Sequence, residues 1–410
     1  MGNISKFSRS CELSANFDAV LLPLFDAQAA VRGPTAQRPA ASDAINNISR
    51  LGLNIYSPAE QVPSYENVLC REIARRENDY GAHQSVSSFW FSGHPLKQLS
   101  PEAITELCFR FSNHFSRGTA PKAVRGICAT TSELDKPTLA LLAGLQFNCI
   151  ELTLDASIAG NDRSLDKLKA LAEQTADYSQ IKLKFRIRIG DHTHPDFLSR
   201  LLVQVTNTSS QQVELVCSGT STRPRQEGLN STRELLRRTL RFFKSHDWCS
   251  CGNNYFFSKE HALSALREQR KLMFTPWGYQ SWDTQTLLGL GVNAVSMIDG
   301  EYQRNCANPH TYNRCISENT AIPITRYKVG HQDTDLYQNL QNLLCYHLAP
   351  KPEQDTNWAF ARLINKGWLT NQGTNLSLSE EGLVNLNPLC KSLYSRKTNN
   401  SYNAALMPDH

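Results

Sequence analysis

Cysteine is the residue type in this chain with the widest chemical reach, because thiolates bind metals, form disulfides and act as nucleophiles. The 410-residue sequence carries 12 cysteines, and they are scattered rather than clustered. Most stand in apolar stretches, as Cys149 does in FNCI and Cys217 in LVC. In a reducing cytosol such thiols behave as small hydrophobic side chains. The spacing therefore does not predict a disulfide framework.

One group of thiols and imidazoles could bind a metal. Cys249 and Cys251 form a C-x-C pair, with His246 before it and His261 after it. Such a set could hold zinc or a haem iron. The alternative is that these are buried thiols without a metal, and the lack of C-x2-C spacing favours this second interpretation. No metal site is predicted.

A run of arginines lies on and before one predicted helix. The run consists of Arg223, Arg225, Arg233, Arg237, Arg238 and Arg241. Arg237 and Arg241 share a helical face and could meet an acidic ligand. The competing interpretation is a solvated helix face, and the pattern favours it.

The elements that must position these residues alternate in type from residue 51 onward. Such alternation indicates a parallel α/β sheet or barrel. We expect strands at 51–56, 86–91, 124–129, 149–154, 181–189 and 212–217, with a degraded strand near 248–256. We expect helices at 65–80, 136–145, 164–178, 195–205 and 231–246, and one that opens at Ser100 as N-cap. The predicted fold is an open, partial (β/α)6 TIM-like barrel.

Three regions are expected along the chain. Residues 1–50 are rich in Ala, Ser, Pro and Asn and are predicted to be a partly irregular lead-in. Residues 51–305 carry the barrel. Residues 306–410 are predicted to form a C-terminal, mainly helical, winged-helix-like cap.

Composition limits the partners. Hydrophobic residues at 40% and charged residues at 20% are typical of a globular protein, and the net charge of +5 is modest for this length. We therefore expect no nucleic-acid partner. No apolar run reaches the roughly 18 residues that span a bilayer, and the first residues lack a signal-peptide core. No membrane association and a cytoplasmic location are expected.

The most distinctive motif lies at residues 274–279 (FTPWGY) and 287–296 (LLGLGVNAVS), with Tyr302 and Asn305 after it. This segment resembles the oxygen-independent coproporphyrinogen III dehydrogenase family of radical S-adenosylmethionine (SAM) enzymes. The resemblance extends from residue 51 to the end and implies a barrel of the radical SAM type. It also implies two cofactors, a [4Fe-4S] cluster and SAM, and a 5′-deoxyadenosyl radical that drives oxidative decarboxylation of tetrapyrrole propionates.

The cluster loop of that family has no counterpart here. In the family, a C-x3-C-x2-C loop joins a strand that resembles residues 53–58 to a helix that resembles residues 65–73. Only residues 59–64 lie between these segments, and no two cysteines of the chain are four positions apart. Cys70 alone cannot ligate a cluster that needs three thiolates. We therefore expect the [4Fe-4S] cluster to be lost.

The SAM-binding elements implied by the resemblance are altered as well. The family motif G-G-G-T-P resembles residues 91–95 (FSGHP), where Gly93 is one glycine of three. A glutamate that holds the SAM amine corresponds to Cys128. The segment that corresponds to the family pattern D-x-x-x-G-L-P has no acidic residue between Lys182 and Ile189, and Arg186 and Arg188 occupy it. We expect SAM binding to be lost too, so no cofactor is predicted.

Gly289 and Gly291 permit two interpretations. Either the strand packs closely against its neighbours, or the backbone passes close to a ligand at the barrel mouth. Trp277 and Tyr279 could stack on a planar ligand or fill the core. We predict a residual SAM or tetrapyrrole pocket without catalytic residues. Its predicted members are Gly93, Cys128, Trp277, Tyr279, Gly289, Gly291, Asn293 and Ser296.

The predicted function is that of a pseudoenzyme that binds a tetrapyrrole, such as haem, or a protein partner. The alternative is an active enzyme of porphyrin metabolism that holds its iron–sulfur cluster in a non-standard way. A third hypothesis, nucleic-acid binding by the C-terminal cap, needs a dense basic helix. Residues 383–393 carry only Lys391, which argues against it.

Overall fold

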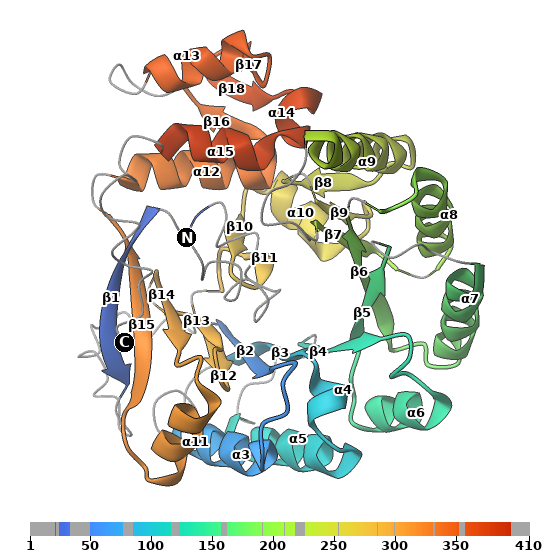
Figure 1. Ribbon diagram of the computed structural model, residues 1–410, viewed down its shortest axis with the longest axis vertical. Coiled ribbons are helices and arrows are strands. Elements are labelled where there is room, and N and C mark those ends of the chain that lie inside the picture. Colours follow the sequence, from blue (N-terminus) through green and yellow to red (C-terminus); the bar gives the residue numbers. More distant parts are fainter. Residues whose placement is uncertain are drawn as a thin grey trace.

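The computed structural model describes fourteen stretches of the chain: residues 21, 24–32, 50–76, 85–115, 123–156, 162–190, 192–208, 210–217, 226–252, 254–284, 286–298, 300–330, 333–351 and 357–394. Their architecture is a large curved sheet with helices along its outer side and a C-terminal helical segment at one end (Figure 1). No helix among these residues is long and apolar enough to cross a membrane.

Seven neighbouring strands of the 13-stranded sheet run parallel. In spatial order they are β12 (Thr286–Leu290), β2 (Arg50–Ser57), β3 (Ser85–Gly93), β4 (Val124–Thr130), β5 (Cys149–Asp155), β6 (Lys182–Ile189) and β7 (Gln212–Cys217). Strands β2 to β7 match the predicted positions within a few residues. The α/β fold with a parallel sheet is therefore confirmed.

Antiparallel strands extend the sheet at both edges. Beyond β12 lie β13 (Val295–Ile298), β14 (Glu301–Asn305), β15 (Ile322–Val329) and β1 (Phe25–Arg32). Beyond β7 lie β9 (Tyr255–Phe257) and β8 (Cys249–Cys251), a hairpin where we expected one degraded strand. The sheet thus includes β15 from beyond residue 305, which pairs with β14, and β1 from the lead-in, which pairs with β15 along eight residues.

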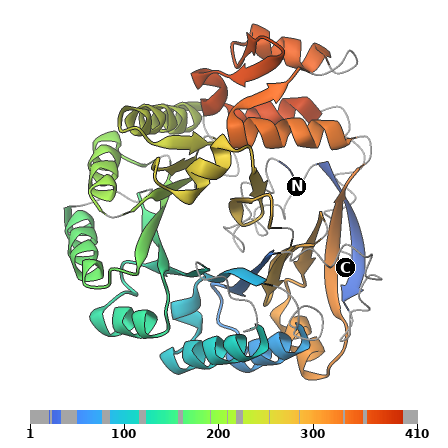
Figure 2. The ribbon, with the colours of Figure 1, turned by 180° about the vertical axis from the view of Figure 1, so that it is seen from behind.

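The connecting helices lie on the outer side of the sheet, as the view from behind also shows (Figure 2). They are α3 (Tyr65–Arg76), α4 (Pro95–Gln98), α5 (Pro101–Phe115), α6 (Lys136–Gly144), α7 (Asp162–Ala176), α8 (Pro195–Thr206) and α9 (Gln226–Ser245). The predicted cap of α5 is present, since the Ser100 hydroxyl accepts the Ala103 N–H at 3.2 Å.

After β9 come α10 (Ala262–Glu268) and a separate hairpin of β10 (Leu272–Thr275) and β11 (Gly278–Ser281). Helix α11 (Pro309–Ser317) precedes β15. The C-terminal segment combines helices with a small antiparallel sheet. Its elements are α12 (Thr334–Tyr346), β16 (Leu348–Pro350), α13 (Asn357–Asn365), β17 (Leu369–Gln372), β18 (Asn375–Leu378), α14 (Glu380–Val384) and α15 (Leu386–Tyr394).

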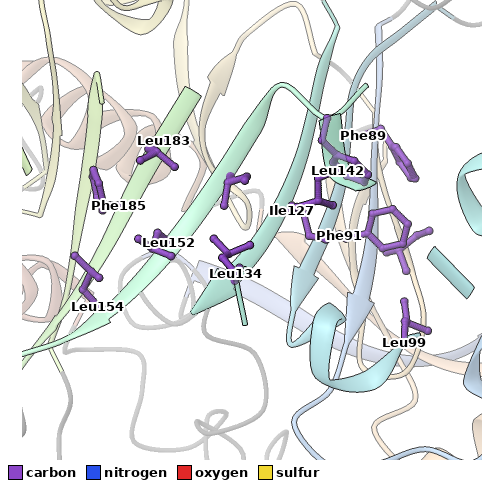
Figure 3. Packing of buried hydrophobic residues seen from close by; sticks show 14 of the residues in the cluster. Phe89, Phe91, Leu99, Ile127, Leu134, Leu142, Leu152, Leu154, Leu183 and Phe185 are labelled. Carbon is purple, nitrogen blue, oxygen red and sulfur yellow. The ribbon is translucent and has the colours of Figure 1, made fainter. Parts of the chain in front are cut away.

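The two faces of the parallel sheet differ in chemistry because side chains alternate along each strand. The outer face, under the helices, is apolar and fully buried, and Figure 3 shows part of it. Phe91, Ile127, Leu152 and Phe185 from four adjacent strands are all 0% exposed. Alternate residues on the inner face are largely polar, and this inner face holds the candidate site.

Candidate binding site at the carboxyl ends of the parallel strands

Cross-strand register brings charged residues together on the inner face. Glu151 on β5 lies between Cys128 on β4 and Lys184 on β6. Arg186 follows Lys184 by two residues on β6, closer to the carboxyl end of the strand, and it lies opposite Glu214 on β7. Strand alternation points these residues away from the helices, so they meet inside the sheet's curve.

Four of these residues form a buried ion network, defined here as Glu151, Lys184, Arg186 and Glu214. The Arg186 Nη1 lies 3.0 Å from Glu151 Oε1, and its Nε and Nη2 donate to Glu214 Oε2 at 3.2 and 2.9 Å. Lys184 Nζ contacts Glu151 Oε2. All four side chains are at most about a tenth exposed. The two negative charges of the glutamates match the two positive charges of Lys184 and Arg186. Buried ionised side chains are tolerated when they are paired in this way.

The network fixes the ionisation of its members. Burial opposes ionisation of Glu151, but Arg186 and Lys184 outweigh burial and lower the pKa of Glu151 to about 2. Burial alone would lower the pKa of Lys184, yet Glu151 raises it above its usual range. The Cys128 thiol lies 3.5 Å from Glu151 Oε1, and burial raises the pKa of that thiol. Cys128 is therefore a neutral thiol beside an ionised carboxylate.

A cavity of about 70 Å³ opens above the network at the carboxyl ends of β2 to β6. We call it the mouth cavity. Its lining residues are Tyr56, Ala59, Gly93, His94, Cys128, Ala129, Thr130, Glu133, Thr153, Arg186 and Arg188. In open parallel α/β sheets, as in barrels, ligand sites lie at the carboxyl ends of the strands.

Two predicted site residues, Gly93 and Cys128, line the mouth cavity. Gly93 has φ +76°, and a Cβ there would lie 2.1 Å from the Ser57 carbonyl oxygen. The close approach of β2 and β3 therefore requires glycine at this position. His94, next in sequence, is half-buried, and its burial lowers the pKa of the imidazole.

The other six predicted site residues do not line the mouth cavity. A Cβ on Gly289 would lie 2.2 Å from the Val295 carbonyl oxygen, and one on Gly291 would lie 2.3 Å from Tyr65 Oη. The Gly291 N–H donates to the buried Glu72 carboxylate at 2.8 Å. We call this packed region, from Gly289 to Asn293 with its contacts, the glycine junction. Packing within the chain accounts for its glycines.

The aromatic and polar members of the predicted pocket are also packed on the chain itself. Trp277 Nε1–H donates to the Val295 carbonyl at 3.1 Å, and its ring packs with Leu287 and Met297. Tyr279 donates to the Leu344 carbonyl at 3.2 Å.

Ser296 accepts the Gly289 N–H at 3.0 Å and is 0% exposed. Asn293 is buried with φ +57°, and its N–H donates to the Cys306 carbonyl at 3.0 Å. The glycine junction and these side chains thus form core rather than the lining of the mouth cavity.

The C-x-C pair and its histidines have separate partners. Cys251 donates to the Cys345 carbonyl, whereas Cys249 lies beside the Ser264 hydroxyl. The His246 ring contacts the Phe242 carbonyl, and His261 caps α10 by accepting the Leu263 N–H. These contacts fit the interpretation of buried thiols.

The arginine run meets acidic residues of the chain itself. Arg237 pairs with Glu381 at 2.9 Å, and Arg241 pairs with Glu380 at 2.7 Å. These contacts join α9 to α14. Arg223 and Arg225 lie outside the described residues.

A [4Fe-4S] cluster does not fit the residues at this site. The segment between β2 and α3, residues 58–64, contains no cysteine. Cys128 is the single cysteine in the cavity lining, and its thiol is held neutral. A cluster bound to protein needs three thiolates.

SAM is too large for this cavity, and its charges find few partners there. Arg186 and Arg188 could pair only with its carboxylate, Glu151 is already paired with two cations, and Glu133 is the one carboxylate in the lining. The cavity of about 70 Å³ is also well below the roughly 300–1,000 Å³ of pockets that enclose ligands of this size.

Sequence reasoning missed the ion network. It did not single out Glu151, Lys184 or Glu214, and it noted Arg186 only as a departure from the acidic residue of the family pattern. A signal was present in β6, where Lys184, Arg186 and Arg188 alternate with buried apolar residues. Three cations at every second position of a strand inside a parallel sheet require buried acidic partners. The partners lie on other strands, so the sequence alone did not identify them.

Comparisons with known proteins place the chain among its relatives. No protein-family profile matches it. An oxygen-independent coproporphyrinogen III oxidase from Pseudomonas aeruginosa is 23% identical over 297 residues, which are 68% of this chain and 64% of that protein. The match thus spans somewhat less than two thirds of the relative's length.

The solved structure of coproporphyrinogen III oxidase (HemN) from Escherichia coli, described as a radical SAM enzyme, has the same fold. It superimposes with a TM-score of 0.67 at 16% identity and covers 92% of each chain. The chain is therefore related to oxygen-independent coproporphyrinogen III oxidase and shares the fold of this radical SAM enzyme.

Proposed function

We propose that this chain is a non-catalytic relative of oxygen-independent coproporphyrinogen III oxidase that acts as an accessory protein of tetrapyrrole metabolism. The observation that carries the proposal is the segment of residues 58–64, which joins β2 directly to α3 without a cysteine. In the related oxidases the corresponding loop binds the iron–sulfur cluster. Without that cluster no electron reaches SAM and no 5′-deoxyadenosyl radical forms.

The mouth cavity is the feature that supports a binding role for this chain, one that needs no radical chemistry. It lies at the carboxyl ends of β2 to β6, and two arginines contribute to its lining. A tetrapyrrole with propionate arms could place one carboxylate there, whereas its ring is too large for a cavity of about 70 Å³. A tetrapyrrole would therefore dock across the mouth, with its ring outside the cavity.

Anaerobic reconstitution with iron and sulfide tests the loss of radical chemistry. The oxidase from Escherichia coli, treated in parallel, serves as the positive control. We expect no protein-bound cluster in this chain by visible absorption and by iron and sulfide content. A stoichiometric cluster would instead support the alternative function, an active enzyme with a non-standard cluster site.

Fluorescence quenching by coproporphyrin III and by haem tests the retained binding. We expect saturable quenching of the intrinsic tryptophan emission by at least one of the two. If neither tetrapyrrole binds, the tetrapyrrole part of the proposal is wrong, and binding of a protein partner remains as the accessory role.

A further inference from the structure

We propose that a second cavity, between α9 and the C-terminal segment, binds a small aromatic carboxylate. This cavity has a volume of about 240 Å³ and shares no lining residue with the mouth cavity. We call it the α9 cavity. Its walls come from α9, from the β8–β9 hairpin with the residue that precedes it, and from β18 and α14. Figure 1 shows α14 beside α9 at this end of the sheet. The site is separate from the proposed tetrapyrrole role.

Strand register explains why space is left at this position. Ser250 on β8 lies opposite Phe256 on β9, which in turn lies opposite Val213 on β7. Phe256 and Val213 are 0% exposed and belong to the apolar core under the helices. Ser250 shares their face of the sheet, because residues in register point to the same side. A small polar side chain thus ends an apolar row at β8, the last strand of the sheet.

The apolar walls suit a flat ring. The half-buried Trp248 ring lies 4.9 Å from the ring of Phe243, which stacks on Phe256 at 4.3 Å and 19° between planes. Leu240 on α9 and Leu383 on α14 add aliphatic surface. An aromatic ligand would pack on Trp248 in an offset or edge-on arrangement, and the leucines would cover the rest of its ring.

The charged residues of the lining leave a single positive charge. Arg241 and Glu380 pair at 2.7 Å and cancel. Lys244 is the third charged residue of the lining, and no carboxylate in the described part of the chain pairs with its ammonium. The α9 cavity therefore favours a monoanion. Lys244 also lies in the last turn of α9, where the helix dipole stabilises a cation, so the experiment must separate these two roles.

Two further donors give an independent indication of a polar group in the ligand. Trp248 and Ser250 both line the α9 cavity and are half-buried. Within the described ranges, neither the indole N–H of Trp248 nor the hydroxyl of Ser250 has a hydrogen-bond partner. Water can satisfy such donors in the free protein. A carboxylate accepts several hydrogen bonds and donates none, so it matches a lining whose uncommitted groups are an ammonium, an N–H and an O–H.

The volume limits the size of the ligand. The α9 cavity, at about 240 Å³, is smaller than the roughly 300–1,000 Å³ of pockets for drug-sized ligands. A single ring with a short acid chain is the class that fits, and 3-phenylpropionate is a suitable probe. Two matched probes lack one feature each: 3-phenylpropionamide has no charge, and propionate has no ring.

Calorimetric titration of the full chain with these three probes tests the site. We expect saturable binding of 3-phenylpropionate and weaker binding of the other two. Ser250→Leu should weaken binding about tenfold or more, because the added carbons occupy the space of the ring. Ser250→Ala keeps that space and should retain most of the affinity. Lys244→Gln should weaken binding about fivefold, as for an ion pair with an exposed ammonium. Lys391→Gln, an equal charge change on α15 outside the lining, should leave binding unchanged.

Three results would overturn the proposal. They are no saturable heat with 3-phenylpropionate up to about 10 mM, undiminished binding to Ser250→Leu, and equal losses from Lys244→Gln and Lys391→Gln. Denaturant unfolding of Lys244→Gln separates the two roles of the lysine: a loss of stability without a loss of affinity leaves only the helix role and contradicts the anion site. Should Ser250→Leu fail to fold, Leu383→Phe narrows the cavity from α14 instead. Coproporphyrin III should bind equally to the wild-type protein and Ser250→Leu, which keeps this proposal distinct from the tetrapyrrole role.

Discussion

The glycine junction and the inner face of β4 to β7 are both buried, and the structure gives each a different role. The glycine junction carries the G-x-G on which the predicted resemblance rested, yet Gly289 and Gly291 are surrounded by the chain's own backbone and side chains. The inner face carries the buried ion network and the mouth cavity.

The contrast shows that similarity to a family and ligand contact need not coincide. A glycine at φ +108° beside Tyr65 Oη is required by packing whatever the protein binds. Gly93, which lines the mouth cavity, is also required by packing. A glycine alone therefore does not identify a ligand site, and the charged residues of the cavity lining are the better indication of ligand chemistry.

The largest effect is expected at the glycine junction. Gly291→Val combines a positive φ with a Cβ placed 2.3 Å from Tyr65 Oη and 2.7 Å from the Tyr56 carbonyl oxygen. Backbone strain and overpacking together should cost about 4 kcal/mol or more. Denaturant unfolding should show a severely destabilised or insoluble protein.

Gly144→Ala is the matched control for this prediction. A Cβ on Gly144 meets nothing within 4 Å, so we expect no loss of stability. If Gly291→Val folds normally and loses only tetrapyrrole binding, the glycine junction is part of a ligand pocket and the contrast between the two regions fails.

The next largest effect is expected in the ion network. Glu151→Gln removes the carboxylate that lies between Lys184 and Arg186 and leaves buried positive charge without compensation. We expect a loss of about 3 kcal/mol in the free energy of unfolding. Adding Lys184→Met should recover part of the loss, because it restores the charge balance. A double variant no more stable than the single one would show that the charges are not coupled.

The same carboxylate predicts an acid-sensitive fold. The pKa of Glu151 is lowered from 4.5 to about 2 in the folded protein, so its contribution is fully present above pH 4.5. It is lost as the pH falls from about 4.5 to about 2, and it amounts to up to about 3 kcal/mol. Stability should therefore fall more steeply in this window in the wild-type protein than in Glu151→Gln. Parallel acid-unfolding curves for the two proteins would contradict the assignment.

The smallest effect on stability is expected from an arginine–glutamate pair that lies at the surface. Arg241 and Glu380 lie 2.7 Å apart, but their side chains are 64% and 49% exposed. Arg241→Gln should change the free energy of unfolding by less than about 0.5 kcal/mol, since water and salt screen the pair. A loss comparable to that of Glu151→Gln would mean that the contact between α9 and α14 is more important than its exposure suggests.

The sequence was sufficient for most of the fold because the apolar periodicity of β2 to β7 and their helices is strong. It did not predict β1, where the alanine-rich stretch FDAQAAVR within a polar lead-in lacks the usual strand residues. Its partner, β15, lies almost 300 residues away in the chain, and such pairing leaves no local signal.

The site was predicted less well than the fold. Gly93 and Cys128 line the mouth cavity, whereas Trp277, Gly289 and Gly291 belong to the core. A glycine required by packing and one required by a ligand look the same in a sequence. The ion network also escaped prediction, because Glu151 and Glu214 become partners of Arg186 only through the register of the sheet.

Calorimetric titration of the full chain with SAM tests the central claim most directly. The claim is that the mouth cavity does not suit SAM, because its volume is about 70 Å³ and its lining sets two arginines beside a single carboxylate, Glu133. We predict no saturable heat with SAM under anaerobic conditions in which the oxidase from Escherichia coli binds it. Saturable binding with micromolar affinity would contradict the account.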